Sequence, residues 1–182
     1  MTRLIYITWL TLLLHSPFSI SADVLPAPDG YTWKRVAEVK AAFLVPDGWN
    51  YQQDRKGNTL GVFITRESIP SKGKYDTGMG INIFPKDINA TKQLLKALVV
   101  IAERYKSNIS KAEFGPFVRF YTQHDSIRSS DGENIRAVHI VVANSNTNST
   151  YYIVFESPVP LWDKFWPVGD VLVNNLVLET EF

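Results

Sequence analysis

The hydrophobic positions along the chain follow two different periods, and the change between them separates a central helix from the segments around it. In the stretch NATKQLLKALVVIAERYKSN, apolar residues recur at helical spacing at Leu94, Leu95, Leu98, Ile101, Ala102 and Tyr105. Charged residues occupy most of the opposite side. This pattern predicts an amphipathic helix over residues 89–108, with Asp87 or Asn89 as its N-cap.

Short segments of strand-forming residues flank this helix on both sides. Before it lie residues 31–36, 40–45, 50–54, 59–67 and 79–84, and RKGN at 55–58 is a hairpin turn signal. After it lie residues 113–123, 134–144 and 150–157, whose short polar connections predict an antiparallel meander. Because residues 137–143 are apolar at almost every position, we expect that strand to be covered on both faces.

The C-terminal segment combines helical spacing with two helix-breaking residues. Its apolar positions recur at Leu161, Trp162, Phe165, Trp166, Val168 and Leu172. Pro167 and Gly169 predict a kink or an interruption in that helix, and residues 176–182 could close the chain as a strand. The predicted fold class is therefore α+β, a single domain over residues 23–182 in which an antiparallel β-sheet is flanked by helices on both faces.

Residues 1–22 are typical of a secretory signal peptide. Arg3 supplies a charged start, residues 4–14 form an apolar run, and cleavage is expected after Ser21 or Ala22. The apolar run is shorter than the roughly 20 residues that a membrane span needs, so we expect no stable membrane span after cleavage. The mature domain is then periplasmic or secreted. It contains no cysteine, which fits an exported domain large enough to rely on its core.

The charge balance argues against a nucleic-acid partner. The chain has 19 basic and 18 acidic residues, and Arg3 is the only charged residue in the signal segment. The mature domain is therefore neutral, and its charges are scattered. A nucleic-acid-binding protein needs a basic face that displaces counterions from phosphates.

Motifs that would indicate catalysis, a cofactor or a metal site are missing from the sequence. There is no cysteine nucleophile, no Gly-x-Ser-x-Gly elbow and no glycine-rich nucleotide loop. No His, Cys or carboxylate spacing matches a metal site. We therefore expect no catalytic residue, no cofactor, no metal and no enzymatic activity.

The mature domain has two histidines, His124 and His139. His139 lies mid-strand among apolar neighbours, which predicts a buried, hydrogen-bonded ring. His124 is followed by Asp125, but adjacent strand residues point to opposite faces, so Asp125 should not orient it. In the predicted meander His124 lies at a loop end and His139 well inside, so we expect the two not to meet. A hydrolase that uses His124, or Glu179 and Glu181, is the third functional hypothesis.

Tryptophans are the remaining candidates for a binding site. Trp49 follows a tight turn, and Trp162 and Trp166 share one face of the C-terminal helix. Core packing against the sheet is the favoured interpretation. The alternative is an aromatic groove, because tryptophan is enriched at interfaces. The candidate ligand- or partner-binding residues are thus Trp49, Trp162, Trp166 and His124.

The order of these segments resembles the PsbP-like (Mog/PsbP) α/β/α sandwich superfamily of exported or lumenal proteins. The resemblance spans roughly residues 31–182, through YTWKRVAEVKAAFLVPDGW, GVFITRE, GMGINIF and YIVFESPVPLWDKFWPVGDVLVNNLVL. It implies non-enzymatic adaptors or subunits of larger complexes. It also implies a structural role for Phe43, Pro46, Gly48, Trp49, Pro158 and Trp162. The chain departs from the plant photosystem members in lacking a transit peptide, so the resemblance carries no photosynthetic role.

These observations lead to two expectations of different kinds. The first is an exported, non-catalytic domain that binds a periplasmic or envelope protein as an adaptor or accessory subunit. The alternative is a carrier that holds an apolar small molecule or lipid between sheet and helix.

Overall fold

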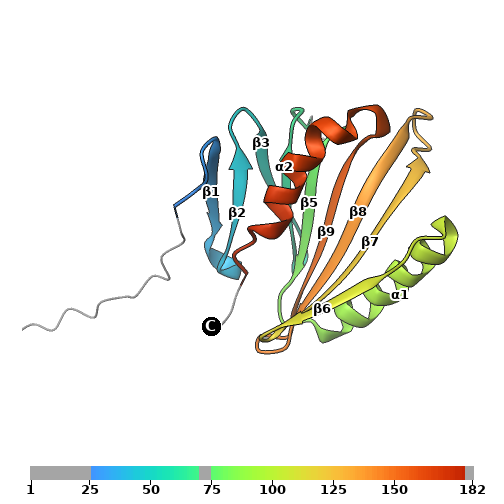
Figure 1. Ribbon diagram of the computed structural model, residues 1–182. Coiled ribbons are helices and arrows are strands. Elements are labelled where there is room, and N and C mark those ends of the chain that lie inside the picture. Colours follow the sequence, from blue (N-terminus) through green and yellow to red (C-terminus); the bar gives the residue numbers. More distant parts are fainter. Residues whose placement is uncertain (1–25, 70–74, 179–182) are drawn as a thin grey trace, which may run out of the picture.

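One large antiparallel sheet with two helices packed on it organises the chain, as the computed structural model in Figure 1 shows. The structure describes residues 26–69 and 75–178. The predicted signal peptide and the two terminal glutamates, Glu179 and Glu181, lie outside the described residues. The fold is therefore of the mixed α+β class.

The large sheet has seven strands in the order β3-β4-β5-β9-β8-β7-β6, and every neighbouring pair is antiparallel. In chain order the strands are β3 (Asn50–Lys56), β4 (Thr59–Thr65), β5 (Gly78–Phe84), β6 (Ser110–Phe114), β7 (Phe117–Ile127), β8 (Asn134–Asn144) and β9 (Ser149–Pro158). The predicted hairpin turn joins β3 to β4, and β7, β8 and β9 form the predicted meander.

A separate hairpin completes the strand inventory of the described residues. It pairs β1 (Tyr31–Val36) with β2 (Ala41–Pro46) through the 3-10 turn η1 (Ala37–Val39). Every residue of β2 is buried, and the Phe43 side chain is completely inaccessible to solvent. Because β2 contacts α2, the hairpin covers part of the core beside that helix.

The central helix, α1 (Ile88–Tyr105), begins and ends close to the predicted limits. Asp87 is its N-cap and accepts hydrogen bonds from the backbone N–H groups of Asn89 and Ala90. The helix contacts β7, β8 and β9. The Thr91 and Thr150 hydroxyls share a hydrogen bond at its start, which fixes that end over β9.

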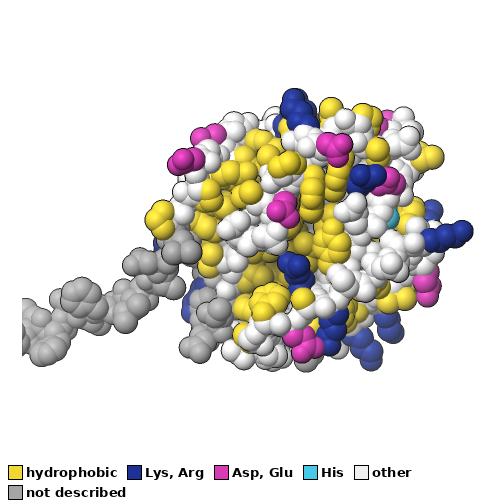
Figure 2. Space-filling model, in the orientation of Figure 1, with side chains coloured by type: hydrophobic (Ala, Val, Ile, Leu, Met, Phe, Trp, Pro, Cys, Tyr) yellow, Lys and Arg dark blue, Asp and Glu magenta, His cyan; other side chains and the backbone are white. Residues whose placement is uncertain are grey.

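The C-terminal helix, α2 (Trp162–Asn174), follows the 3-10 turn η2 (Val159–Leu161) and closes the hydrophobic core. The Trp162 and Trp166 rings stack with their centroids 4.9 Å apart. Both meet the ring of Phe155 edge-on, at 5.9 and 5.7 Å. Trp49 meets Phe165 in the same way at 6.3 Å. Hydrophobic side chains gather along α2 and over the neighbouring strands (Figure 2). Each tryptophan therefore has a packing role.

Three predicted elements differ from the structure. Residues 113–123 are not one strand, because the chain reverses at Gly115-Pro116 between β6 and β7. The helix α2 runs through Pro167 and Gly169 without interruption, and the lack of a Cβ at Gly169 lets the helix lie close to the ring of Phe155. Of the predicted C-terminal strand, the described part ends at Leu178 and forms only an isolated bridge between Val177 and Ala42.

Replacing Gly169 with alanine tests the packing of α2 on the sheet. A Cβ at this position would lie 2.7 Å from Cζ of Phe155. We expect Gly169→Ala to lower the free energy of unfolding by about 1–3 kcal/mol, even though alanine is the better helix former. Urea denaturation measures the change. In a Phe155→Leu background the clashing ring atoms are absent, so the cost should shrink. An equal cost in both backgrounds would contradict this account.

Candidate functional site

A pocket of about 390 Å³ opens between the C-terminal half of α1 and the strands β7, β8 and β9. We call it the α1 pocket. Its lining combines apolar, aromatic and ionisable side chains: Val100, Ile101, Arg104, Tyr105, His124, Ser126, Arg128, Ser129, Ile135, Ala137, His139 and Glu156.

Ala137 forms the middle of the pocket floor. In the sheet register it pairs with His124 of β7 on one side and with Glu156 of β9 on the other. Paired residues in adjacent antiparallel strands present their side chains on the same face. His124 and Glu156 therefore flank the small Ala137 side chain. His139, two residues further along β8, projects from the same face.

His124 and His139 meet in the structure, so the prediction that they would not is wrong. Their Nε2 atoms are 3.0 Å apart, and Nδ1 of His139 lies 2.8 Å from the hydroxyl of Tyr152. The prediction considered position along each strand alone. Because His124 pairs with Ala137, His139 lies on the diagonal, which is within reach of aromatic side chains. The Tyr105 ring stacks on His124, with the centroids 4.0 Å apart.

This hydrogen-bond chain leaves one ring nitrogen of His124 without a partner. While both imidazoles are neutral, only one proton can lie between the two Nε2 atoms. If His139 supplies that proton, His124 carries its own on Nδ1; if His124 supplies it, its Nδ1 is a bare acceptor. In either case Nδ1 of His124 is buried and forms no hydrogen bond with the described residues.

Burial keeps both histidines uncharged near neutral pH. Desolvation, together with the neighbouring His124, lowers the pKa of His139 to about 4. Desolvation also lowers the pKa of His124. Both imidazoles therefore gain charge only in acid, because the charged form loses its hydration when the ring is buried.

Glu156 is the carboxylate that lines the α1 pocket. Desolvation raises its pKa; the Arg128 charge opposes this rise and the Asp76 charge adds to it. Within residues 26–69 and 75–178, its carboxylate has neither a hydrogen-bond donor nor an ion-pair partner. The capacity of this group to bind a donor is thus unused.

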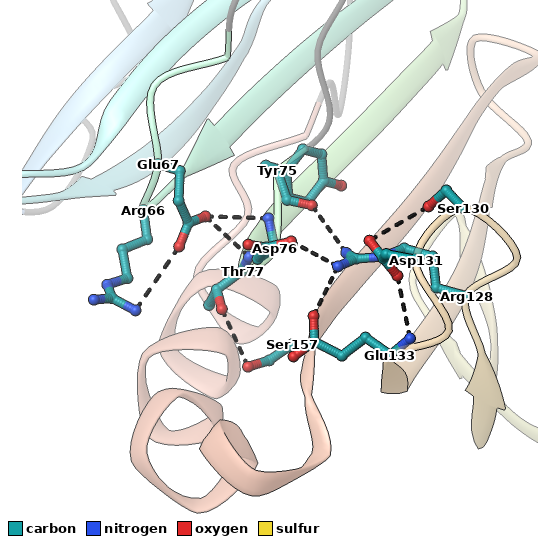
Figure 3. Close-up of polar contacts among 10 residues, drawn as sticks. All are labelled: Arg66, Glu67, Tyr75, Asp76, Thr77, Arg128, Ser130, Asp131, Glu133 and Ser157. Carbon is teal, nitrogen blue, oxygen red and sulfur yellow. Dashed lines mark hydrogen bonds and ion pairs between the residues drawn. The ribbon is translucent and has the colours of Figure 1, made fainter.

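Arg128 lies at the loop end of the α1 pocket, and its guanidinium is already engaged (Figure 3). It forms ion pairs with Asp76, Asp131 and Glu133. Its Nη1 also donates to the carbonyl oxygen of Tyr75 at 3.5 Å. These contacts connect the β7–β8 connection to the segment that enters β5. The primary role of Arg128 is to hold these two loops together.

One exposed apolar side chain, Val100 of α1, lines the α1 pocket and is 61% exposed. Val99, beside it on the helix, is also exposed. Arg104 lies at the rim, and no described carboxylate forms an ion pair with it. The rim thus combines apolar surface with one unpaired cation.

The structure separates the candidate residues into two groups. Trp49, Trp162 and Trp166 belong to the core beneath and beside α2, whereas His124 lines the α1 pocket. Asp125 ion-pairs with Arg136 at 2.6 Å and does not orient His124, as the alternation of strand residues predicts.

Sequence reasoning missed three members of the site, Glu156, Tyr105 and Tyr152. Counting the pairing outward from the β7–β8 and β8–β9 turns would have placed Glu156 level with His124. The stacking of Tyr105 on His124 depends on how α1 lies across the sheet, which no local pattern specifies.

In the described part of the chain, no group of three or more His, Cys, Asp and Glu side chains could hold a metal ion. Neither of the two described helices combines the length and the apolar character that crossing a membrane requires.

Replacing His139 with glutamine should reduce the loss of stability in acid. The His139 imidazole has its ordinary pKa of 6.5 in the unfolded chain and a pKa of about 4 in the folded protein. Between pH 6.5 and pH 4 a proton therefore binds the unfolded chain in preference to the folded one. The free energy of unfolding that this imidazole contributes above pH 6.5 is lost as the pH falls towards 4, by up to about 3 kcal/mol. Urea unfolding at both ends of the window measures this loss.

Comparing the wild type with His139→Gln separates the contribution of His139 to the pH dependence of stability from the contributions of other titrating groups. The raised pKa of Glu156 acts in the opposite direction, because the folded state keeps that proton to higher pH. That contribution is common to the wild type and His139→Gln. Equal losses of stability in the two proteins would contradict the assignment.

Comparisons with known proteins bear on the fold. No family model matches the sequence, and no curated protein matches it. Cyanobacterial PsbP (CyanoP) from Synechocystis sp. PCC 6803 is a similar solved structure, with a TM-score of 0.53 at 10% identity, covering 88% of this chain and 99% of that chain. PA94 of Pseudomonas aeruginosa, a protein of unknown function and putative regulator, has a TM-score of 0.46 at 12% identity, covering 82% of this chain and 97% of that chain. LpqN of Mycobacterium tuberculosis, involved in cell envelope biogenesis, has a TM-score of 0.47 at 11% identity, covering 81% of this chain and 90% of that chain. The chain has a PsbP-like fold, as the sequence resemblance predicted; at this identity the likeness concerns the fold alone.

Proposed function

We propose that this chain is an exported, non-catalytic accessory domain that binds a segment of a partner protein of the cell envelope through the α1 pocket. The observation that carries the proposal is the exposure of Val100, with Val99 beside it on α1, at an open pocket. An exposed apolar patch beside a concavity is typical of interaction sites. The hydrophobic tryptophans, by contrast, are already used in the core.

The location outside the cytoplasm follows from the N-terminal pattern. A charged start, a short apolar run and small residues before Asp23 favour an export signal. A periplasmic or secreted mature domain is the proposed location.

The proposed architecture is an α/β/α sandwich. The Thr150 side chain meets α1, whereas the Phe155 side chain meets α2. These residues are five apart in β9, so their side chains project from opposite faces of the sheet. Buried residues along almost all of β8 support coverage on both sides.

The proposal of a non-catalytic role rests on how the histidines are used. Both ring nitrogens of His139 are hydrogen-bonded, and the Nε2 of His124 binds His139. No described hydroxyl is hydrogen-bonded to His124 as a nucleophile is to its general base. The arrangement supports a structural use of the histidine pair.

A carrier of an apolar small molecule is the second candidate function. The pocket volume of about 390 Å³ falls within the range of roughly 300–1,000 Å³ that small-molecule sites occupy. Native mass spectrometry of protein purified from its own host distinguishes this candidate. An adduct that Val100→Asp abolishes would support the carrier, and a clean apo mass would count against it.

Photocrosslinking tests whether the α1 pocket faces a partner protein. A benzophenone amino acid in place of Val100 should form a specific crosslink in the native envelope, whereas the same group in place of Leu161 should not. Leu161 is the matched control because it is an exposed apolar residue, 37% accessible, beside α2.

The partner identified from the crosslink is then purified and its affinity measured. Val100→Asp should weaken binding by about tenfold or more, because it places a charge in an apolar contact. Leu161→Asp should leave the affinity unchanged. If both variants bind the purified partner as the wild type does, the pocket is not the binding surface.

A further inference from the structure

The carboxylate of Glu156 is the one acidic group that lines the α1 pocket, and it forms no ion pair with the residues that the structure describes. It lies on the floor beside Ala137, partly removed from water, and accepts no hydrogen bond from the described residues. A desolvated carboxylate without a donor lowers the stability of the folded state. An occupant that brings a positively charged donor would remove this penalty.

Arg128 does not meet this requirement. Its Nε and Nη2 atoms are already bonded to Asp76, Asp131 and Glu133. One guanidinium faces three carboxylates there, so its charge is compensated within the cluster. Its charge lowers the pKa of Glu156, but it forms no hydrogen bond or ion pair with that carboxylate.

An anionic occupant is less well matched to the site. The free cation at the pocket is Arg104, which lies at the rim in the last turn of α1. A cation at that position already interacts favourably with the negative end of the helix dipole. An anion placed deeper would approach the Glu156 carboxylate beside uncharged histidines, and the Arg128 guanidinium at the loop end is already bonded to three carboxylates.

The shape of the pocket suits a long basic side chain. Val100, Ile101 and Ile135 form its apolar walls, and the small Ala137 side chain leaves the floor open between His124 and Glu156. Lysine and arginine combine an apolar stem with a charged end. The stem would contact the walls while the charged end reaches the carboxylate.

We propose that the α1 pocket binds a lysine or arginine side chain, carried by an otherwise apolar segment of the partner protein, with the Glu156 carboxylate as its counter-ion. This inference rests on the proposed function and specifies the chemistry of the partner. The exposed Val100 then contacts an apolar residue that flanks the basic side chain.

Binding of a cation should weaken in acid. Protonation of Glu156 removes the counter-ion, and charging of the histidines adds repulsion. The titratable and charged groups that face Glu156 or line its pocket are Tyr75, Asp76, Arg104, Tyr105, His124, Arg128, His139 and Tyr152. As the pH falls, the changes in Glu156, His124 and His139 all make the pocket more positive.

The direct test uses n-hexylammonium and n-hexanoate, two probes of equal chain length and opposite charge, titrated into the purified mature domain by NMR. Hexylammonium should shift resonances of pocket residues, and hexanoate should not. Glu156→Gln should weaken hexylammonium binding by about tenfold. Glu103→Gln removes the same charge from an exposed α1 position outside the α1 pocket and should leave binding unchanged.

Each outcome has a defined meaning. Equal binding by wild type and Glu156→Gln, binding of hexanoate in preference to hexylammonium, or cation binding that strengthens in acid overturns the inference. The pH series on the wild type decides the question if Glu156→Gln fails to fold. A Val100 crosslink to a partner whose affinity is unchanged by Glu156→Gln refutes the basic side chain but leaves the proposed function standing. Hexylammonium binding that depends on Glu156, without any partner crosslink, points instead to a carrier of small amines.

Discussion

The antiparallel register of β7, β8 and β9 is the constraint on which both the core and the α1 pocket depend. Because Ala137 pairs with His124 and with Glu156, an imidazole and a carboxylate lie on either side of a small side chain, and His139 is brought to His124. A shift of one residue in either pairing would move each of these groups to the other face of the sheet. It would also move the apolar residues of β8 and β9 out of the core.

Strand β9 links the packing of the protein to the chemistry of the pocket. Phe155 is completely buried and supports both tryptophans of α2, and the next residue, Glu156, lines the α1 pocket. Adjacent strand residues project from opposite faces, so the contacts that hold Phe155 also determine the position of the carboxylate. The tryptophans therefore act on the pocket indirectly, by holding β9 in place. The close contact of Gly169 with Phe155 therefore affects the position of the Glu156 carboxylate as well as the stability of the protein.

The electrostatics of the α1 pocket differ from those of the neighbouring loops. Arg128 is surrounded by carboxylates and stabilises the loop contacts. Glu156 forms no hydrogen bond or ion pair with the described residues, and the two histidines remain neutral because they are desolvated. Desolvated ionisable groups in a cleft lower stability, and they concentrate at functional sites. The basic side chain proposed for the partner supplies the interaction that this arrangement leaves open.

Local patterns in the sequence determined the identity of most elements. The spacing from Leu94 to Tyr105 predicted α1, the RKGN turn predicted the β3–β4 hairpin, and strand alternation correctly separated His124 from Asp125. The resemblance to PsbP-like proteins anticipated the fold. The local pattern failed for the C-terminal helix, which continues through Pro167 and Gly169 and lies close to Phe155, a residue distant in sequence. Only the tertiary structure decided that His124, His139 and Glu156 share one pocket. That arrangement depends on pairing between strands and on the position of α1 across them, and neither is encoded in the spacing of residues along a single segment.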